Sequence, residues 1–192
     1  MTKIKSIGII AEDNSDFETS KVLISRIIKK DNIKFKKAIG NGCAKVKSKA
    51  LTYSKVLKNR GCNLLILIHD LDRNNLQTLN TELDRKLKDC PIKDYFVCIP
   101  IEEIEAWLLS DPAGIKEALN LRKAPNVQGN PETIKSPKER LEKYVETYSN
   151  HEKDYNNVKD NEKIAAKICI DKVKAKCNSF KLLHDFLLSH TY

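Results

Sequence analysis

Three short groups of acidic residues are the part of this sequence whose types and spacing are best suited to chemistry. Each group directly follows an apolar stretch, and the groups are Glu12 with Asp13 and Asp16, Asp70 with Asp72, and Glu102 with Glu103 and Glu105. Carboxylates that converge on one place repel one another unless a cation lies among them. Hard divalent ions such as Mg²⁺ or Mn²⁺ are held by a few carboxylates and water molecules. The residue types therefore predict a divalent-metal site wherever the fold brings the groups together.

Each acidic group also has a simpler interpretation. Asp16 and Glu18 can complement the start of a helix, where acidic side chains are favoured. Asp70 and Asp72 can initiate a turn, and the acids at positions 102–105 can occupy the first turn of a helix. Any one group alone would be weak grounds for a metal site. The occurrence of all three after predicted strands favours one.

Four apolar stretches predict the strands that would position these carboxylates, at residues 3–11, 33–39, 63–70 and 95–99. Helical patterns separate them, and the stretch 63–70 is apolar on both faces, as expected of a central parallel strand. This alternation predicts an α/β fold with right-handed crossovers and a parallel-rich central sheet flanked by helices. Ligands bind beyond the carboxyl ends of such strands. We therefore expect Asp70 and Asp72 at a solvent-facing strand end.

Short sequence signals predict where the elements begin and end. Ser15 followed by Glu18 fits a capping box for the first helix, and a basic helix at 43–59 lies between the turn 40–42 and Gly61. Past residue 102 the pattern is helical, with segments expected at 101–109, from 111 onward, and at 137–148, 162–176 and 180–189. We predict an α/β domain over residues 1–110 and a helical C-terminal extension over 111–192 packed on it.

The segment 101–109 predicts a helix with two faces. Ile101, Ile104 and Leu108 fall at helical spacing and should be buried. Trp107 should pack at the junction with the C-terminal extension. Glu102 and Glu105, three residues apart, should share a flank turned toward the metal.

Positive charge is concentrated in one window of the chain. Residues 21–60 hold thirteen Lys or Arg and a single acid, a net charge of +12, whereas the whole 192-residue chain carries +9. Such a window is a candidate contact surface for a phosphate backbone. Lys45, Lys47 and Lys49 follow the turn at 40–42 and are the candidate nucleic-acid-binding residues. An exposed helix face that only keeps the protein in solution remains an equal alternative.

Several classes of protein are excluded or disfavoured by composition. The longest uninterrupted apolar run, 64–68, is far short of the roughly 20 residues that a spanning helix needs. The first ten residues lack the apolar stretch of a signal peptide, so we expect a cytoplasmic protein without a membrane partner. The six cysteines form no C-x-x-C pair, which argues against a zinc ribbon and favours reduced, mostly buried thiols.

The order of these motifs resembles a known fold. Glu12 with Asp16 four residues later, followed by an apolar strand into Asp70-Leu71-Asp72, resembles the Toprim fold of topoisomerases, bacterial primases and OLD-type nucleases. The segment from Glu103 to Asp111 is similar to the E-x-W-L-L block of RloB-like and related uncharacterised Toprim families. Asp13 stands where their E-G-x-T-E signature has glycine, so close approach of the backbone to a phosphate is not expected there.

The resemblance implies a metal-dependent nuclease. It assigns catalysis to Glu12, Asp70 and Asp72, which would bind Mg²⁺ or Mn²⁺ with Asp16 and Glu105 as further ligands or as groups that position water. Many members of these families are encoded beside an ABC/AAA-type ATPase, which implies an effector in phage defence with an ATPase partner. The expected substrate is DNA or RNA.

Two other functions stay open. The chain can be a non-catalytic Toprim-like subunit that binds nucleic acid or an ATPase. Glu12, Asp13 and Asp70 also suit a phosphoacceptor receiver domain, but such a domain needs a fifth strand ending in lysine, and no strand is predicted after residue 99.

Overall fold

The chain folds around a four-stranded parallel sheet. The computed structural model describes residues 4–30 and 32–190, and within them the strands lie in the order β2-β1-β3-β4. Their bounds are β1 Ser6–Ala11, β2 Lys34–Ile39, β3 Leu64–Ile68 and β4 Tyr95–Cys98. This arrangement confirms the predicted α/β fold and is consistent with a Toprim-like sheet.

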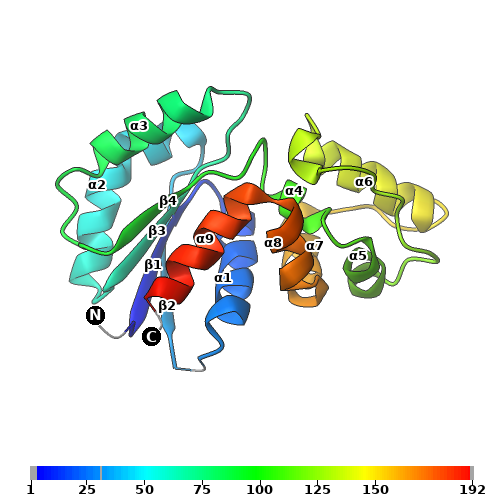
Figure 1. Ribbon diagram of the computed structural model, residues 1–192, viewed down its shortest axis with the longest axis horizontal. Helices are drawn as coiled ribbons and strands as arrows, with labels where there is room; N and C mark the ends of the chain where they lie inside the picture. The colour runs from blue at the N-terminus through cyan, green and yellow to red at the C-terminus, as the bar shows by residue number, and fades with distance from the viewer. Residues whose placement is uncertain (1–3, 31, 191–192) are drawn as a thin grey trace.

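The connections after the first three strands are helices that cover the sheet (Figure 1). They are α1 Asn14–Ile28, α2 Cys43–Asn59 and α3 Leu76–Lys86. Alternate residues of the central strands enter two cores: Ile9 and Ile66 pack with α1, whereas Ile10 and Leu67 pack with α2 and α3. Both faces of β1 and β3 are therefore buried, which explains why their sequences are apolar throughout.

Helix α1 begins earlier than its sequence signal suggests. Asp13 is the N-cap, its carboxylate accepts from the Asp16 backbone N–H at 3.0 Å, and the Asp16 side chain accepts in return from the Asp13 N–H. The prediction that Ser15 and Glu18 form the capping box is wrong. Ser15 is instead buried, and its hydroxyl donates to the carbonyl of Asn157 at 2.9 Å. The backbone of Asp13 is extended, so this position does not demand glycine.

The remainder of the chain is helical and returns to the sheet. Its elements are α4 Glu105–Leu108, α5 Pro112–Leu119, the 3₁₀ turn η1 Pro131–Thr133, α6 Pro137–Tyr148, α7 Asn157–Lys167, α8 Ile170–Lys176 and α9 Asn178–Ser189. Helices α7 and α9 pack along α1, and α9 also contacts β4, where Phe186 stacks on Phe96 with ring centroids 4.9 Å apart. One apolar core thus joins both parts of the chain, and a domain boundary at residue 110 stays a prediction.

Two predicted helices are shorter than expected. The segment 101–109 forms only the single turn α4, because Glu102 adopts a left-handed φ of 60° that an α-helix cannot contain. The expected helix 162–176 is two helices, since Ile168 and Cys169 are extended between α7 and α8. Helix α7 also starts five residues earlier, at Asn157, where Asn156 caps it.

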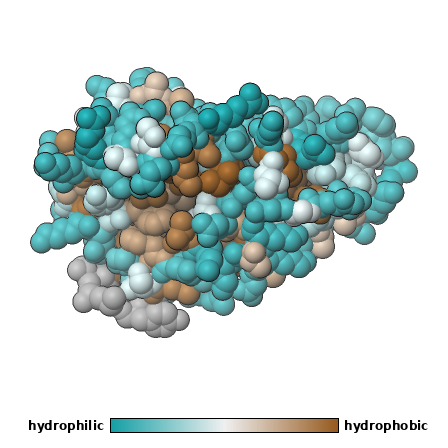
Figure 2. Space-filling model, turned by 45° about the horizontal axis from the view of Figure 1, so that its top comes forward, coloured by the Kyte–Doolittle hydropathy of each residue, from teal (hydrophilic) through white to brown (hydrophobic). Residues whose placement is uncertain are grey.

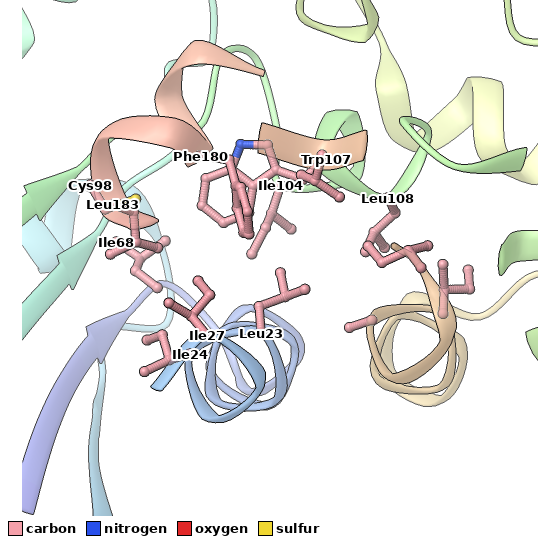
Figure 3. Packing of buried hydrophobic residues seen from close by; sticks show 14 of the residues in the cluster. Leu23, Ile24, Ile27, Ile68, Cys98, Ile104, Trp107, Leu108, Phe180 and Leu183 are labelled. Carbon is pink, nitrogen blue, oxygen red and sulfur yellow. The ribbon is translucent and has the colours of Figure 1, made fainter. Parts of the chain in front are cut away.

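Trp107 joins α4 to the C-terminal helices (Figure 3). Its side chain is fully buried, its indole N–H donates to the Ser179 hydroxyl at 2.8 Å, and its ring meets Phe180 edge-on at 5.2 Å. Ile104 and Leu108 are buried as predicted. Ile101 is only partly buried and belongs to the core on the other side of the sheet, so its assignment to the same face is wrong.

The outer edge of β4 is accessible and apolar. A groove of about 310 Å³ beside it is lined by Phe96 and Ile99 together with Leu76 and Leu182, whose side chains are among the exposed large apolar ones. Figure 2 shows apolar side chains gathered in the middle of one face and surrounded by hydrophilic ones. None of the described helices is long and apolar enough to cross a membrane.

Close packing between α5 and α7 predicts an intolerant glycine. A Cβ added at Gly114 would lie 2.7 Å from the Cα of Ile168, a backbone atom that cannot move aside cheaply. We expect Gly114→Ala to lower the free energy of unfolding by about 1–3 kcal/mol. Ala113→Ser on the exposed side of the same helix is the control and should change it by less than about 0.5 kcal/mol. Urea denaturation measures both, and equal stabilities would contradict this packing.

Candidate metal centre

The ends of the strands carry the acidic groups to one edge of the sheet. Backbone pairing continues past the strands: the Asn41 N–H donates to the Glu12 carbonyl at 2.8 Å, and the Asp72 N–H donates to the Glu102 carbonyl at 3.2 Å. The first bond joins the loops after β1 and β2, and the second joins the loops after β3 and β4. The carboxyl edge is therefore built from four separate parts of the sequence.

A strained turn presents Asp72 to solvent. Asp72 and Arg73 both adopt left-handed φ values, 47° and 62°, and the turn is closed by the Asn74 N–H, which donates to the Leu71 carbonyl at 2.8 Å. Such conformations are costly for residues other than glycine and gather at functional sites. Asp72 is exposed, as predicted, at this turn.

Glu12 and Asp72 come within coordination reach of each other, with Cys43 as a third group. One carboxylate oxygen of each acid and the Cys43 Sγ all lie within 4.8 Å of one another. The Glu12 carboxylate also accepts from the Cys43 backbone N–H. Burial, followed by the charge of Asp72, raises the pKa of Glu12. A cation among these groups would relieve that repulsion.

Asp70 lies deeper than the sequence suggests. Burial raises its pKa well above the ordinary range, and the carboxylates of Asp16, Glu105, Asp72 and Glu12 raise it further. Its Oδ1 atom is buried without a hydrogen-bond partner among the described residues. The expectation of a solvent-facing Asp70 is wrong for this oxygen, because the residues on both sides of Asp70, His69 and Leu71, are buried and the chain is exposed only from Asp72 onward.

Asp16 belongs to the same electrostatic neighbourhood. Its pKa is raised well above the ordinary value by burial and by the charges of Asp13 and Glu105, with a smaller contribution from Glu12. The hydrogen bond that its carboxylate accepts from the Asp13 backbone N–H counteracts part of this rise. Asp16 thus serves the N-terminus of α1 and adds charge to the edge that holds Asp70, so its two sequence interpretations are compatible.

The C-terminal segment holds Glu105 in place. Glu105 is buried, and its Oε1 accepts from the Asn161 side-chain amide at 2.9 Å and the Tyr155 hydroxyl at 3.3 Å. The same Asn161 amide group donates to the Ser15 hydroxyl at 3.3 Å. Burial raises the pKa of Glu105, and the hydrogen bonds from Asn161 and Tyr155 counteract part of that rise. Residues 50 or more positions away thus orient this carboxylate.

Glu102 and Glu103, the other members of the third acidic group, have structural positions different from that of Glu105. The Glu103 carboxylate accepts from the Lys138 backbone N–H at 2.9 Å and so caps the start of α6. Glu102 precedes α4 rather than lying on it. The predicted shared flank of Glu102 and Glu105 is therefore wrong, because the two residues are not on one helix.

The three candidate lysines of α2 do not act as one group. Lys45 and Lys49, one turn apart, are exposed, whereas the Lys47 ammonium lies 3.2 Å from the Glu82 carboxylate of α3. Lys45 and Lys49 therefore present free charge near the start of α2, and Lys47 links two helices. Contact with nucleic acid stays a prediction for all three.

The donor set fits a divalent cation. The five predicted ligands Glu12, Asp16, Asp70, Asp72 and Glu105 all reach the carboxyl edge, and oxygen donors suit Mg²⁺ or Mn²⁺. The unpartnered Oδ1 of Asp70 is a further reason, because a buried acceptor without a partner costs about 1–3 kcal/mol. Of these five, Glu12 and Asp72 have ligand atoms within 4.8 Å of each other, whereas Asp16, Asp70 and Glu105 lie outside that group.

Sequence reasoning missed Cys43, Tyr155 and Asn161. Cys43 had a usable signal, since it follows the turn after β2 and the carboxyl-edge rule applies there as it does to Glu12. Tyr155 and Asn161 had none, because nothing in a polar stretch indicates which of its side chains turns inward to a carboxylate.

The hydrogen bonds to Glu105 predict a destabilised variant. Asn161→Ala would remove the shorter of the two side-chain donors to a buried carboxylate, and we expect it to lower the free energy of unfolding by about 1–3 kcal/mol. Asn126→Ala is the control, because Asn126 is exposed and its hydrogen bonds use only its backbone. Thermal and urea unfolding measure both. Equal losses would show that the amide of Asn161 does not hold Glu105.

Fold and site define an α/β protein with an acidic centre at the carboxyl edge of a parallel sheet. The chain belongs to the DUF4276 family, a domain of unknown function whose pattern matches residues 11–188. No curated protein and no solved structure matches the sequence. The match covers every candidate ligand, so the acidic centre lies within the family's domain.

Proposed function

We propose that this protein is a divalent-metal-dependent phosphodiesterase of Toprim type that cuts DNA or RNA. The observation that carries the proposal is the pair Glu12 and Asp72 within coordination reach of each other at the carboxyl edge of a parallel sheet, with Asp16, Asp70 and Glu105 near enough for the carboxylates to raise one another's pKa. Such a density of negative charge disfavours an anionic substrate unless a cation comes with it.

The roles of the residues follow from their positions. A bound divalent ion would lower the pKa of water and neutralise charge on the phosphate that is being cleaved. Glu12 and Asp72 would hold the ion, and Asp70, whose Oδ1 is buried without a partner among the described residues, would be a further ligand. Glu105, fixed by Asn161 and Tyr155, can accept a proton from the attacking water.

The basic window supplies the complementary charge for a polyanion. Lys45 and Lys49 extend from α2, whose first residue lies at the metal centre, so a phosphate backbone can reach them and the carboxylates together. By resemblance to Toprim families, we also propose an ABC/AAA-type ATPase partner and a role in phage defence.

The direct test is cleavage by the purified protein. Labelled single-stranded and duplex DNA and RNA are incubated with Mg²⁺, Mn²⁺ or EDTA, using wild type, Asp72→Asn and the control Asp89→Asn, an exposed acid on the loop after α3. We expect metal-dependent products from wild type and the control only. Binding without cleavage, with or without an ATPase partner, would instead favour the non-catalytic subunit.

Nucleic-acid binding should depend on Lys45 and Lys49. Reversing both charges should weaken binding across sequences and reduce the slope of log K against log salt by about 1 for each lost phosphate contact. Lys47→Glu is an informative comparison, because Lys47 already pairs with Glu82. Fluorescence anisotropy at several salt concentrations measures the slopes. Unchanged slopes would leave the positive window as solubilising charge.

The receiver-domain alternative is not favoured. It requires a fifth strand ending in lysine, and the sheet of the described residues has four strands, followed from residue 105 onward by helices. A receiver domain also has no use for a polyanion, so the anisotropy experiment separates the two functions.

A further inference from the structure

A thiol lies among the carboxylates of the proposed metal centre. Cys43 Sγ is within 4.8 Å of a carboxylate oxygen of both Glu12 and Asp72, although carboxylates alone suffice for a Mg²⁺ site. Of the six cysteines, three are buried in the apolar cores, where burial raises the pKa of Cys177, for example, to about 12. Cys43 is different because it is half-exposed and faces two acids.

The backbone fixes Cys43 in this position. Gly42, with a φ of 117°, turns the chain into α2, and Cys43 is the first residue of that helix. The Cys43 N–H donates to the Glu12 carboxylate, and the Asn41 N–H donates to the Glu12 carbonyl at 2.8 Å. The thiol is thus held beside Glu12 by two connections between the loops after β1 and β2.

A separate observation indicates that this place receives a ligand. His69 is 1% exposed, its Nδ1 lies 2.6 Å from the Asp70 carbonyl, and its Nε2 is buried with no partner among the described residues. The ring lies near Glu12, since a positive charge on it would lower the pKa of that acid. An ion with its water, or a substrate oxygen, would supply the partner that Nε2 lacks.

We propose that Cys43 is a metal ligand together with Glu12 and Asp72, and that the centre therefore binds borderline and soft divalent ions such as Zn²⁺, Co²⁺ and Cd²⁺ through sulfur. Thiolate ligands select such ions, whereas Mg²⁺ takes oxygen ligands only. Coordination releases the thiol proton to solvent. The inference rests on the proposed metal centre and names the class of ion that it prefers.

The test is a titration of the full chain with Co²⁺ and Cd²⁺, followed by ultraviolet absorption. Thiolate bound to either ion gives a charge-transfer band that carboxylates do not give. We expect the band in wild type and in the control Cys90→Ser plus Cys169→Ser, which removes the other two half-exposed thiols. In Cys43→Ser the band should disappear, and the affinity for Cd²⁺ should fall by about 100-fold, with Mg²⁺ affinity changed less than about 3-fold.

The outcomes separate this inference from the proposed nuclease function. A band that is absent from wild type, or that persists in Cys43→Ser, overturns the role of the thiol even if Mg²⁺-dependent cleavage is observed. A band that depends on Cys43 upholds the inference even if no nucleic acid is cut. Circular dichroism of Cys43→Ser, and a repeat with Cys43→Ala, ensure that loss of the band reflects loss of the sulfur and not of the fold.

Discussion

Asp70→Asn should reduce metal-dependent cleavage by at least about 100-fold and leave the protein folded. The amide has nearly the same shape as the carboxylate but carries no charge, so it fills the same space while removing a buried ligand oxygen. The metal-free variant should also be more stable than wild type. Burial, followed by four neighbouring carboxylates, raises the pKa of Asp70, and replacing it removes both the buried charge and that repulsion.

The two effects of Asp70→Asn must be measured on the same preparation. Cleavage rates at saturating Mg²⁺ give the first, and thermal unfolding in EDTA gives the second. Asp89→Asn is the control for both, since it is exposed and lies on the loop after α3. A variant that cuts at the wild-type rate would remove Asp70 from the catalytic centre. A variant that cuts slowly and is also unstable without metal would make its role structural.

The sequence predicts the sheet well because its strands are buried on both faces. The run 64–68 has no polar position, and only a central parallel strand makes use of such a run. Helix α6 was predicted at its observed bounds, since Ser136-Pro137 sets its start and Tyr148 ends its apolar pattern. The predicted bounds are wrong where contacts between distant segments determine the local structure. The Ser15 hydroxyl donates to the Asn157 carbonyl instead of capping α1, and the predicted helix 162–176 is interrupted at Ile168, where α5 packs closely.

The candidate site was predictable only in part, for a related reason. Strand ends determine where Glu12, Asp70 and Asp72 lie, and a strand pattern is readable from local sequence. Which side chains then support these acids depends on how distant segments pack. Asn161 reaches Glu105 because α7 packs against α4, a contact without a periodic signal.

The stability of the metal-free protein should fall as the pH rises above the ordinary carboxyl pKa of about 4. The pKa values of Asp70 and Asp16 are raised well above the ordinary range, chiefly by burial, and those of Glu12 and Glu105 are raised as well. Between the ordinary carboxyl pKa, about 4, and these higher values the unfolded chain has lost protons that the folded chain keeps. Their contribution to stability is therefore complete below about pH 4 and is lost as the pH rises through the folded pKa values.

Asp111 provides an internal contrast of opposite sign. Burial pushes its pKa up, but hydrogen bonds from Lys172 and the Cys169 backbone N–H hold it below the ordinary value. Its contribution is present above the unfolded pKa and is lost as the pH falls through the folded one. Asp111→Asn should therefore change how stability falls as the pH is lowered. Asp70→Asn should change how stability falls as the pH is raised.

A bound divalent metal should cancel this fall in stability with rising pH. An ion that binds only the folded, ionised centre stabilises it by about 2.7 kcal/mol at a concentration 100 times its dissociation constant. We expect unfolding curves in EDTA to show lower stability at pH 8 than at pH 5.5. In Mg²⁺ or Mn²⁺ we expect the stability at pH 8 to rise to that at pH 5.5. Asp16→Asn combined with Asp70→Asn should flatten the decline in EDTA and abolish the response to metal. If the wild-type protein is equally stable at both pH values and indifferent to either ion, these carboxylates neither repel one another nor share a cation.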